Sequence, residues 1–271
     1  MVRSSLRRLA AAAARTAAAF PLVLMVPAAA RAQLEDYPSQ EKYHLRFEYR
    51  EYRPKIDGTL QHGSGDVEGT PIDLLRDLEV LDKRTFEIRG AIQLKRGHKL
   101  RGSYTPLDYR GETEEARRDF IYGATEFQRF ERVVSTFKGA YFAASYEYDF
   151  MKGPKGYLGA VLGARLLDLD AVVAATERGR REIDTIRTPV PVIGLSTRAY
   201  TGRMSIEGEL VGFSLGSKGS LWEFETAARI HFSDRLAVQG GYRRLSIKGE
   251  DGRDNGDVKL KGWNFGLELS L

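Results

Sequence analysis

The chain has 271 residues, with 42 Lys and Arg against 37 Asp and Glu, and it contains no Cys. Without Cys there can be no disulfide, no thiolate metal site and no lipid-modified N-terminal Cys. The first 32 residues hold five Arg and no acidic residue, so 42 minus five leaves 37 basic against 37 acidic residues in the remainder. This neutral balance removes the charge argument for a nucleic-acid partner.

The N-terminal segment has the composition of a secretory signal peptide. Arg residues precede an Ala-rich stretch that ends in a small-residue pattern at Ala32. A membrane anchor is the alternative, but Pro21 and Pro27 interrupt an apolar run of roughly 15 residues, short of the ~20 that span a bilayer. We therefore expect residues 1–32 to be cleaved and residues 33–271 to form one domain.

Strand patterning is the strongest signal in the remainder of the chain. Apolar residues alternate with charged or small polar ones in at least five segments. The apolar positions are Tyr43, Leu45, Phe47 and Tyr49; Phe86, Ile88, Ile92 and Leu94; Phe142, Ala144, Tyr146, Tyr148 and Phe150; Trp222, Phe224, Ala228, Ile230 and Phe232; and Trp263, Phe265, Leu267, Leu269 and Leu271. This pattern predicts an all-β protein.

A soluble barrel or sandwich also alternates, with its apolar face turned inward. Three features favour a membrane barrel instead. Aromatic residues cluster at strand ends, short and long connections alternate, and the chain stops on the apolar Leu271. No apolar run of 18 residues follows Ala32, and only helices and closed barrels satisfy all backbone groups in lipid. We predict an antiparallel transmembrane up-and-down β-barrel.

Turn residues divide the chain into ten expected strands, or eight if two weak ones dissolve. The strands are expected at 42–53, 84–95, 99–110, 132–150, 157–173, 189–201, 204–214, 221–232, 236–248 and 257–271. Four short turns are expected on the periplasmic side, at 96–98, 151–156, 202–203 and 233–235. Five longer extracellular loops are expected at 54–83, 111–131, 174–188, 215–220 and 249–256.

The first two loops carry local signals. Thr70 and the following Pro predict a short helix with Leu74, Leu78 and Leu81 on one face. That helix could lie on the barrel lip or fold inward as a constriction, and a loop packing its own apolar side chains is the alternative. In the second loop we expect a small hairpin around Gln128.

The leader, the alternation of turns and loops, and the ending from Trp263 to Leu271 resemble the class of small bacterial outer-membrane barrels that includes the OmpA transmembrane domain. The resemblance is architectural and covers the whole mature chain. It implies location in the outer membrane of a Gram-negative cell, contact with membrane lipid and lipopolysaccharide, and insertion by the barrel-assembly machinery. Many such barrels end in Phe, whereas this chain ends in Leu271.

Catalytic and metal motifs are weak. The triplet from His231 to Ser233 resembles the His-x-Ser of lipid A deacylases of the PagL type, but the tight turn that follows places it at the periplasmic face. Asp168 and Asp170 stand near the outer end of the fifth expected strand and superficially resemble the paired Asp residues that omptin proteases carry at the outer rim, yet no Asp-x-His occurs. We expect these carboxylates to pair with Arg residues of the adjoining loop, at 178, 180 and 181.

The acidic segment 251–257 lacks EF-hand spacing and is expected to be a polar hairpin tip. His44 and His231 are expected in the lumen, His98 in a turn and His62 in the first loop. No catalytic, cofactor or metal site is predicted.

The polar strand faces predict a lumen filled with balanced charge. Eight Arg oppose eight Glu, namely Arg46, Arg50, Arg89, Arg101, Arg165, Arg198, Arg229 and Arg243 against Glu48, Glu87, Glu147, Glu207, Glu209, Glu223, Glu225 and Glu268. Charges in a restricted bore should form ion-pair networks that fill it. The expected function is a non-enzymatic closed barrel that is structural or acts through its loops. A narrow small-solute channel and a lipid A or surface hydrolase are the alternatives.

Overall fold

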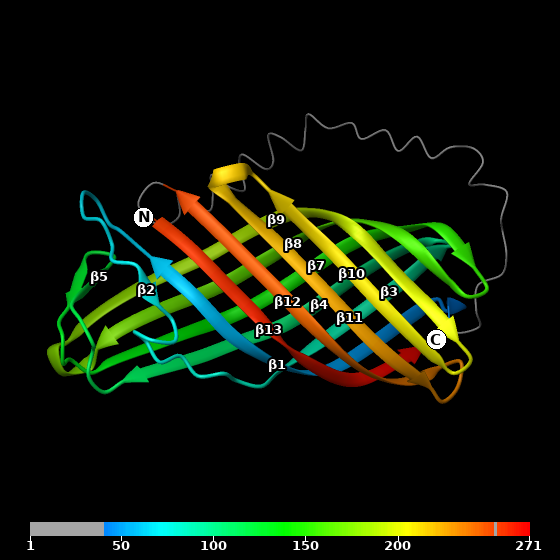
Figure 1. Cartoon of the computed structure of the whole chain (residues 1–271), viewed down its shortest axis with the longest axis horizontal. Helices are drawn as coiled ribbons and strands as arrows, with labels where there is room; N and C mark the ends of the chain where they lie inside the picture. Colours follow the sequence, from blue (N-terminus) through cyan, green and yellow to red (C-terminus); the bar gives the residue numbers. More distant parts are fainter. Residues whose placement is uncertain (1–40, 252–253) are drawn as a thin grey trace.

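The computed structural model describes residues 41–251 and 254–271, so the expected leader, residues 1–32, lies outside the described part. Ten long antiparallel strands form the protein, as predicted (Figure 1). They are β1 (Leu45–Gln61), β3 (Thr85–Lys95), β4 (His98–Thr113), β7 (Val133–Gly153), β8 (Gly156–Ala175), β9 (Arg180–Thr201), β10 (Met204–Ser214), β11 (Gly219–His231), β12 (Leu236–Asp251) and β13 (Asp254–Ser270). The connections contain β2 (Ile72–Asp73), β5 (Phe120–Tyr122), β6 (Thr125–Phe127) and the 3₁₀ turns η3 (Thr176–Arg178) and η4 (Gly216–Lys218).

Pairing between the first and last strands closes the sheet into a barrel. Each long strand pairs with its neighbour in sequence, and β1 pairs with β13 from Arg46↔Ser270 to Gln61↔Asn255. Closure removes the sheet edges, so each strand of the lower barrel has a neighbouring strand on both sides. No helix in the described part of the chain is long and apolar enough to cross a membrane.

The short turns gather at one end of the barrel, as predicted. They occupy residues 96–97, 154–155, 202–203 and 232–235. The C-terminus lies at the same end, where the carbonyl of Leu271 accepts the backbone N–H groups of His44 and Leu45 at 2.7 and 3.0 Å. This end is periplasmic in an outer-membrane barrel.

Two predicted extracellular loops are much shorter in the structure. The expected loops 174–188 and 249–256 are mostly strand, because β8 and β9 pair up to Ala175↔Arg180 and β12 and β13 up to Asp251↔Asp254. Sequence reading missed these strand ends because their alternation has the opposite polarity to that of the lower barrel.

The lower barrel has an apolar exterior. Along β13 and the Leu271 that follows it, alternate side chains from Trp263 to Leu271 are 41–61% exposed, while Asn264 and Glu268 between them are buried. Leu45, Phe47, Ile92, Leu162, Ile206 and Ile230 continue this band on other strands. A closed strand wall with apolar residues outside and charges inside is the arrangement that lipid requires.

Above this band, successive residues still point alternately outward and inward. The inward residues become apolar, however, and the outward ones become charged or polar. On β1, Tyr49 faces outward and Arg50 inward, whereas two residues later Glu51 faces outward and Tyr52 inward. Buried apolar residues then line the inside of the upper barrel, including Ile56 on the same strand. The upper barrel therefore has the inside-apolar, outside-charged pattern of a water-soluble protein, and it projects beyond the membrane.

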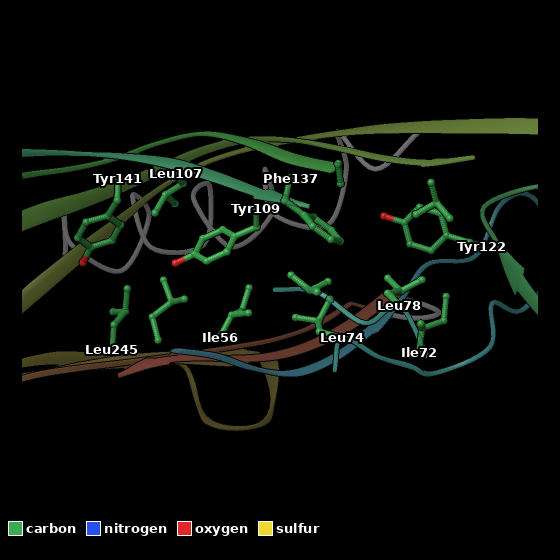
Figure 2. Packing of buried hydrophobic residues seen from close by; sticks show 14 of the residues in the cluster. Ile56, Ile72, Leu74, Leu78, Leu107, Tyr109, Tyr122, Phe137, Tyr141 and Leu245 are labelled. Carbon is green, nitrogen blue, oxygen red and sulfur yellow. The ribbon is translucent and has the colours of Figure 1, made fainter. Parts of the chain in front are cut away.

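The predicted helix after Thr70 does not form. Residues Ile72 and Asp73 pair with β1 as β2, and the N–H of Leu81 donates to the carbonyl of Arg110 on β4 at 3.0 Å. The segment thereby fills the wall between β1 and β4 above the start of β3. Leu74 and Leu78 are buried, but Leu81 is 71% exposed, so the three do not share a face. Leu74 and Leu78 point into the barrel (Figure 2), as expected for a segment that folds inward and not for one that lies on the barrel lip.

The hairpin of the second loop is displaced from its expected centre at Gln128. It is formed by β5 and β6 and turns at Gly123, which has a φ of 64°. Glycine adopts this left-handed conformation without a Cβ clash, so the turn forms there. Phe120 and Phe127 stack across it with ring centroids 4.9 Å apart.

Besides the place above β3 that residues 72–81 fill, the upper wall is also interrupted above the short β10–β11 hairpin. The β9–β10 pairing ends at Ile193↔Gly212, and β9 above that point has no other strand partner on this side among the described residues. Pro189 and Pro191 lie directly above the last pair. Proline has no N–H to donate and is confined to strand edges, so these residues end the ladder and protect the edge from pairing with another chain.

Two expectations at the start of the barrel, for Tyr43 and His44, were wrong. Tyr43 was expected on the apolar, lipid-facing side of the first strand with Leu45, but it is only 5% exposed, and the Arg46 guanidinium lies 4.0 Å from its ring centroid. His44, expected in the lumen, is exposed. The chain before Leu45 leaves the strand and turns into the lumen, so the alternation does not extend to these two residues.

We predict that outward charge on β13 is costly only within the apolar band. Leu267→Arg should lose about 2–4 kcal/mol of stability, because the charge must enter hydrocarbon. Lys261→Ala, an outward change above the band, should stay within about 0.5 kcal/mol. Urea unfolding in phospholipid vesicles, followed by tryptophan fluorescence, measures both variants. Equal losses would contradict the position of the band.

Candidate functional site

The lumen of the lower barrel contains all sixteen predicted charged residues. Thirteen are buried, and Arg89, Arg101 and Glu209 are partly buried. They point inward because they occupy the alternate strand positions opposite the lipid-facing residues.

Each Arg faces more than one carboxylate. Arg229 is fully buried, with its guanidinium nitrogens 2.7 Å from Glu207, 2.8 Å from Glu268 and 3.6 Å from Glu48. Arg50 pairs with both Glu48 and Glu225, which lie far apart in the sequence.

A second group of pairs lies closer to the upper barrel. Arg165 lies 2.7 Å from Glu223 and 3.3 Å from Glu209, and Arg243 lies 2.9 Å from Glu87 and also pairs with Glu223. Arg101 lies 2.5 Å from both Glu147 and Glu209. These shared contacts connect the ten strands across the bore and leave the buried charges compensated.

Sequence reading missed three members of this network: Glu41, Lys99 and Asp149. The Lys99 ammonium lies 2.9 Å from Asp149, 3.0 Å from Glu147 and 3.4 Å from Glu41. Lys99 shares the inward phase of Arg101 and could have been found by extending that alternation. Glu41 precedes the first strand, so no pattern predicted that it enters the periplasmic end of the lumen.

Above the charges lies an apolar cavity, here called the outer chamber. Its volume is about 180 Å³, and its walls include Leu107, Phe137, Leu169, Val190 and Leu245 from five strands. Figure 2 shows the inward side chains of this region facing one another across the barrel.

Tyrosines form the boundary between the two compartments. The Tyr141 hydroxyl donates to Glu223 at 3.2 Å, while its ring lines the outer chamber. The Arg243 guanidinium lies 5.1 Å from the Tyr141 ring and 5.8 Å from the Tyr52 ring. Such residues join a polar end to an apolar body, so charged and aromatic side chains form the floor of the chamber.

Four polar residues meet at the extracellular side of the outer chamber; we call them the rim cluster. They are His62, Tyr122, Asp184 and Asp254. The His62 Nδ1 lies 3.0 Å from an Asp254 carboxylate oxygen, which also accepts the N–H of Gly63 at 3.0 Å. The Tyr122 ring packs edge-on against His62, with centroids 5.3 Å apart.

Burial changes the acidity of two rim-cluster groups, both of which lie above the membrane band. Burial raises the pKa of the Asp184 carboxyl; His62 opposes the increase and Asp254 adds to it. Burial also raises the pKa of the Tyr122 hydroxyl, and the carboxylates of Asp184, Glu182 and Asp254 add to that increase. No sequence motif joined these residues, which lie 192 positions apart at the extremes.

The structure gives the His and the Ser of the His-x-Ser triplet different partners. The His231 Nε2 lies 2.9 Å from the hydroxyl of Ser205 on the neighbouring strand, whereas the Ser233 hydroxyl accepts the N–H groups of Arg235 and Leu236 in the turn. The two members of the His-x-Ser triplet therefore do not form a pair.

Asp168 and Asp170 do not pair with the residues expected for them. Asp168 lies 3.4 Å from Arg187 on the next strand, and Asp170 accepts the Thr185 hydroxyl at 2.7 Å. The expected partners at 178, 180 and 181 were wrong because the expected loop continues as strand, which places β9 residues beside β8. In the described residues, no group of three or more His, Asp and Glu has metal-binding geometry.

Comparison with solved structures identifies the fold. The outer-membrane protease OmpT of Escherichia coli superposes with a TM-score of 0.52 at 8% identity, over 84% of this chain and 96% of that chain. Ail of Yersinia pestis, in complex with a heparin analogue, gives 0.35 at 13% identity, and Neisserial surface protein A gives 0.27 at 12%, each with the same coverage. No family model and no curated protein matches the sequence.

The closed wall, the apolar exterior band and this likeness define the class: the chain is a small bacterial outer-membrane β-barrel protein with ten strands.

We predict that the lumen pairs are individually essential for stability. Glu207→Gln should lose about 3–5 kcal/mol, since it leaves Arg198 and Arg229 partly uncompensated inside the barrel. Glu51→Gln removes an exposed partner of Arg53 and should lose less than about 1 kcal/mol. Urea titration of vesicle-inserted protein, read by heat-modifiable gel migration, compares the two. Similar losses would argue against the compensated network.

Proposed function

We propose that this protein is a closed barrel that binds a small apolar molecule in the outer chamber at the cell surface. The single observation that carries the proposal is the 180 Å³ apolar cavity above a lumen filled with ion pairs. On this proposal the membrane-embedded half is an anchor, and the extracellular half carries the function. The partners expected from the sequence, outer-membrane lipid, lipopolysaccharide and the assembly machinery, would serve the anchor.

Support for a closed lumen comes from the size and pairing of its side chains. Barrels of about eight strands have interiors that side chains fill. Here ten strands direct long Arg, Glu and Lys side chains inward, and Arg50, Arg198 and Arg229 have at most 1% of their surface exposed. A narrow channel would need these buried pairs to separate, with loss of charge compensation.

Support for ligand binding comes from the chemistry of the chamber. An apolar cavity of about 150 Å³ in a protein interior stays dry and binds a molecule the size of benzene. The outer chamber is slightly larger and is lined by similar side chains. The rim cluster adds the few polar groups that typically orient a ligand in such a pocket.

A surface hydrolase is supported less well. OmpT is described as a protease, and the His62–Asp254 contact would hold an imidazole in the orientation of a general base. However, the His62 ring forms its hydrogen bond with Asp254. Among the described residues, no hydroxyl nucleophile is hydrogen-bonded to the His62 ring. We therefore propose binding and not hydrolysis.

We predict that the intact barrel does not admit small sugars. Liposomes containing the folded protein should swell in isotonic arabinose no faster than protein-free liposomes, because the ion-paired side chains fill the bore. A general porin reconstituted in parallel is the positive control. Swelling at the porin rate would overturn the closed-lumen part of the proposal.

We predict that toluene binds the outer chamber and that filling the chamber abolishes binding. Val190→Trp places a large side chain inside it and should weaken toluene binding at least about tenfold. The matched control is Ile193→Trp, on the same strand but facing outward, where Ile193 is 52% exposed. Saturation-transfer NMR with protein in lipid nanodiscs measures binding, with empty nanodiscs as the blank. Equal signals from the two variants would show partition into lipid and contradict the proposal.

A further inference from the structure

Asp184 differs from every other buried carboxylate in the described part of the chain. The other ten are Glu41, Glu48, Glu87, Glu131, Glu147, Asp149, Glu207, Glu223, Glu225 and Glu268, and each has a Lys or Arg within ion-pair distance. Asp184 is 8% exposed and has no Lys or Arg partner among the described residues. This protein otherwise compensates its buried acids, so the exception calls for an explanation.

Asp184 lies on the inner face of β9, beside the outer chamber. It pairs across β8 with Ala171, which is fully buried, and both residues line the outer chamber. The carboxylate is therefore directed inward, against the apolar surface that would hold a ligand.

Within residues 41–251 and 254–271, the groups around Asp184 include no Lys or Arg at ion-pair distance. From the first loop, the His62 ring is oriented by Asp254 of β13. From β5, Tyr122 contributes an aromatic ring and a hydroxyl, and on β9 itself Glu182 accepts the Thr125 hydroxyl at 2.9 Å. The rim cluster thus carries two carboxylates, Asp184 and Asp254, with Glu182 as a third carboxylate beside it, and one imidazole whose charge depends on protonation.

The Asp184 carboxylate accepts the backbone N–H of Thr185 and faces His62, but no Lys or Arg of the described residues pairs with it. A buried carboxylate without a paired cation is unfavourable, and a ligand cation that reaches it gains a charge-assisted hydrogen bond in a region of low dielectric constant. We infer that the outer chamber is a site for small apolar amines, with the hydrocarbon group in the chamber and the ammonium group on the Asp184 carboxylate. This inference rests on the proposed function and specifies its ligand class. The chamber volume limits the hydrocarbon to about one aromatic ring.

The test uses the folded full barrel in lipid nanodiscs at pH 7, with three ligands of one size. Toluene is neutral, benzylamine is a cation and benzoate is an anion. Affinities are measured by saturation-transfer NMR, with the chamber-filling Val190→Trp variant as the blank for lipid partition. Benzylamine should bind at least about tenfold more tightly than toluene, and benzoate should bind more weakly than toluene.

Asp184→Asn assigns the effect to the carboxylate, because it keeps the side-chain shape and removes the charge. The ratio of benzylamine to toluene affinity should fall at least about tenfold in this variant. Asp170→Asn is the matched control, since Asp170 is an exposed carboxylate on the outside of the neighbouring strand β8, and it should leave the ratio unchanged. Heat-modifiable gel migration confirms that each variant is folded.

The outcomes separate the inference from the proposed function. Chamber-dependent toluene binding without a preference for benzylamine in the wild-type barrel overturns the amine site alone, even if Asp184→Asn fails to fold. An unchanged affinity ratio in folded Asp184→Asn also overturns it. Absence of chamber-dependent binding for all three ligands overturns both.

Discussion

The structure of this protein depends on one constraint, the pairing of backbone groups within a wall that is closed in the membrane. A strand in lipid cannot leave its N–H and C=O groups without partners, so the first and last strands must pair. The β1–β13 register runs without interruption over sixteen pairs from Arg46 to Gln61. Once the wall is closed, each residue has only two directions available, into the bore or outward. The type of residue at each inward and outward position then determines the properties of the bore and of the outer surface.

Along the strands that continue into the upper barrel, inward and outward positions are filled in two opposite ways. In the membrane, apolar side chains face lipid and charged ones face the bore. Above the membrane, Glu51 and Lys55 face water, while Tyr52 and Ile56 face inward. The backbone continues through this change without a break, since phase depends on geometry and polarity depends on the surrounding solvent. One continuous barrel therefore contains a salt-bridged compartment and an apolar compartment.

The two gaps in the upper wall show how the strand lengths matter. Above β3, the segment from Ile72 to Leu81 pairs with both flanking strands and restores the wall. Above β10 and β11, a short turn at η4 leaves the β9 edge without a strand partner in the described residues. Pro189 and Pro191 make that edge unsuitable for pairing. The outer chamber is bounded by β9 on one side of this gap and by β12 on the other.

The alternation of residues was enough to predict the barrel, its ten strands, its short turns and the charges of the lower bore. It succeeded there because a residue such as Phe265 or Glu268 is constrained by lipid or lumen at a fixed position in the strand. Partners such as Arg229 and Glu48 could not be assigned, because they meet across the bore from strands far apart in sequence.

The upper barrel was decided by tertiary structure. Its strands reverse polarity, so a reading based on the membrane pattern treated residues 174–188 as loop. The outer chamber exists only where several strands converge, and the rim cluster brings His62, Asp184 and Asp254 together from three distant segments. Local sequence determined which face the strand residues of the lower barrel take, from Leu45 onward. Closure of the barrel alone determined which side chains share a compartment, because that depends on contacts between residues that no local pattern connects.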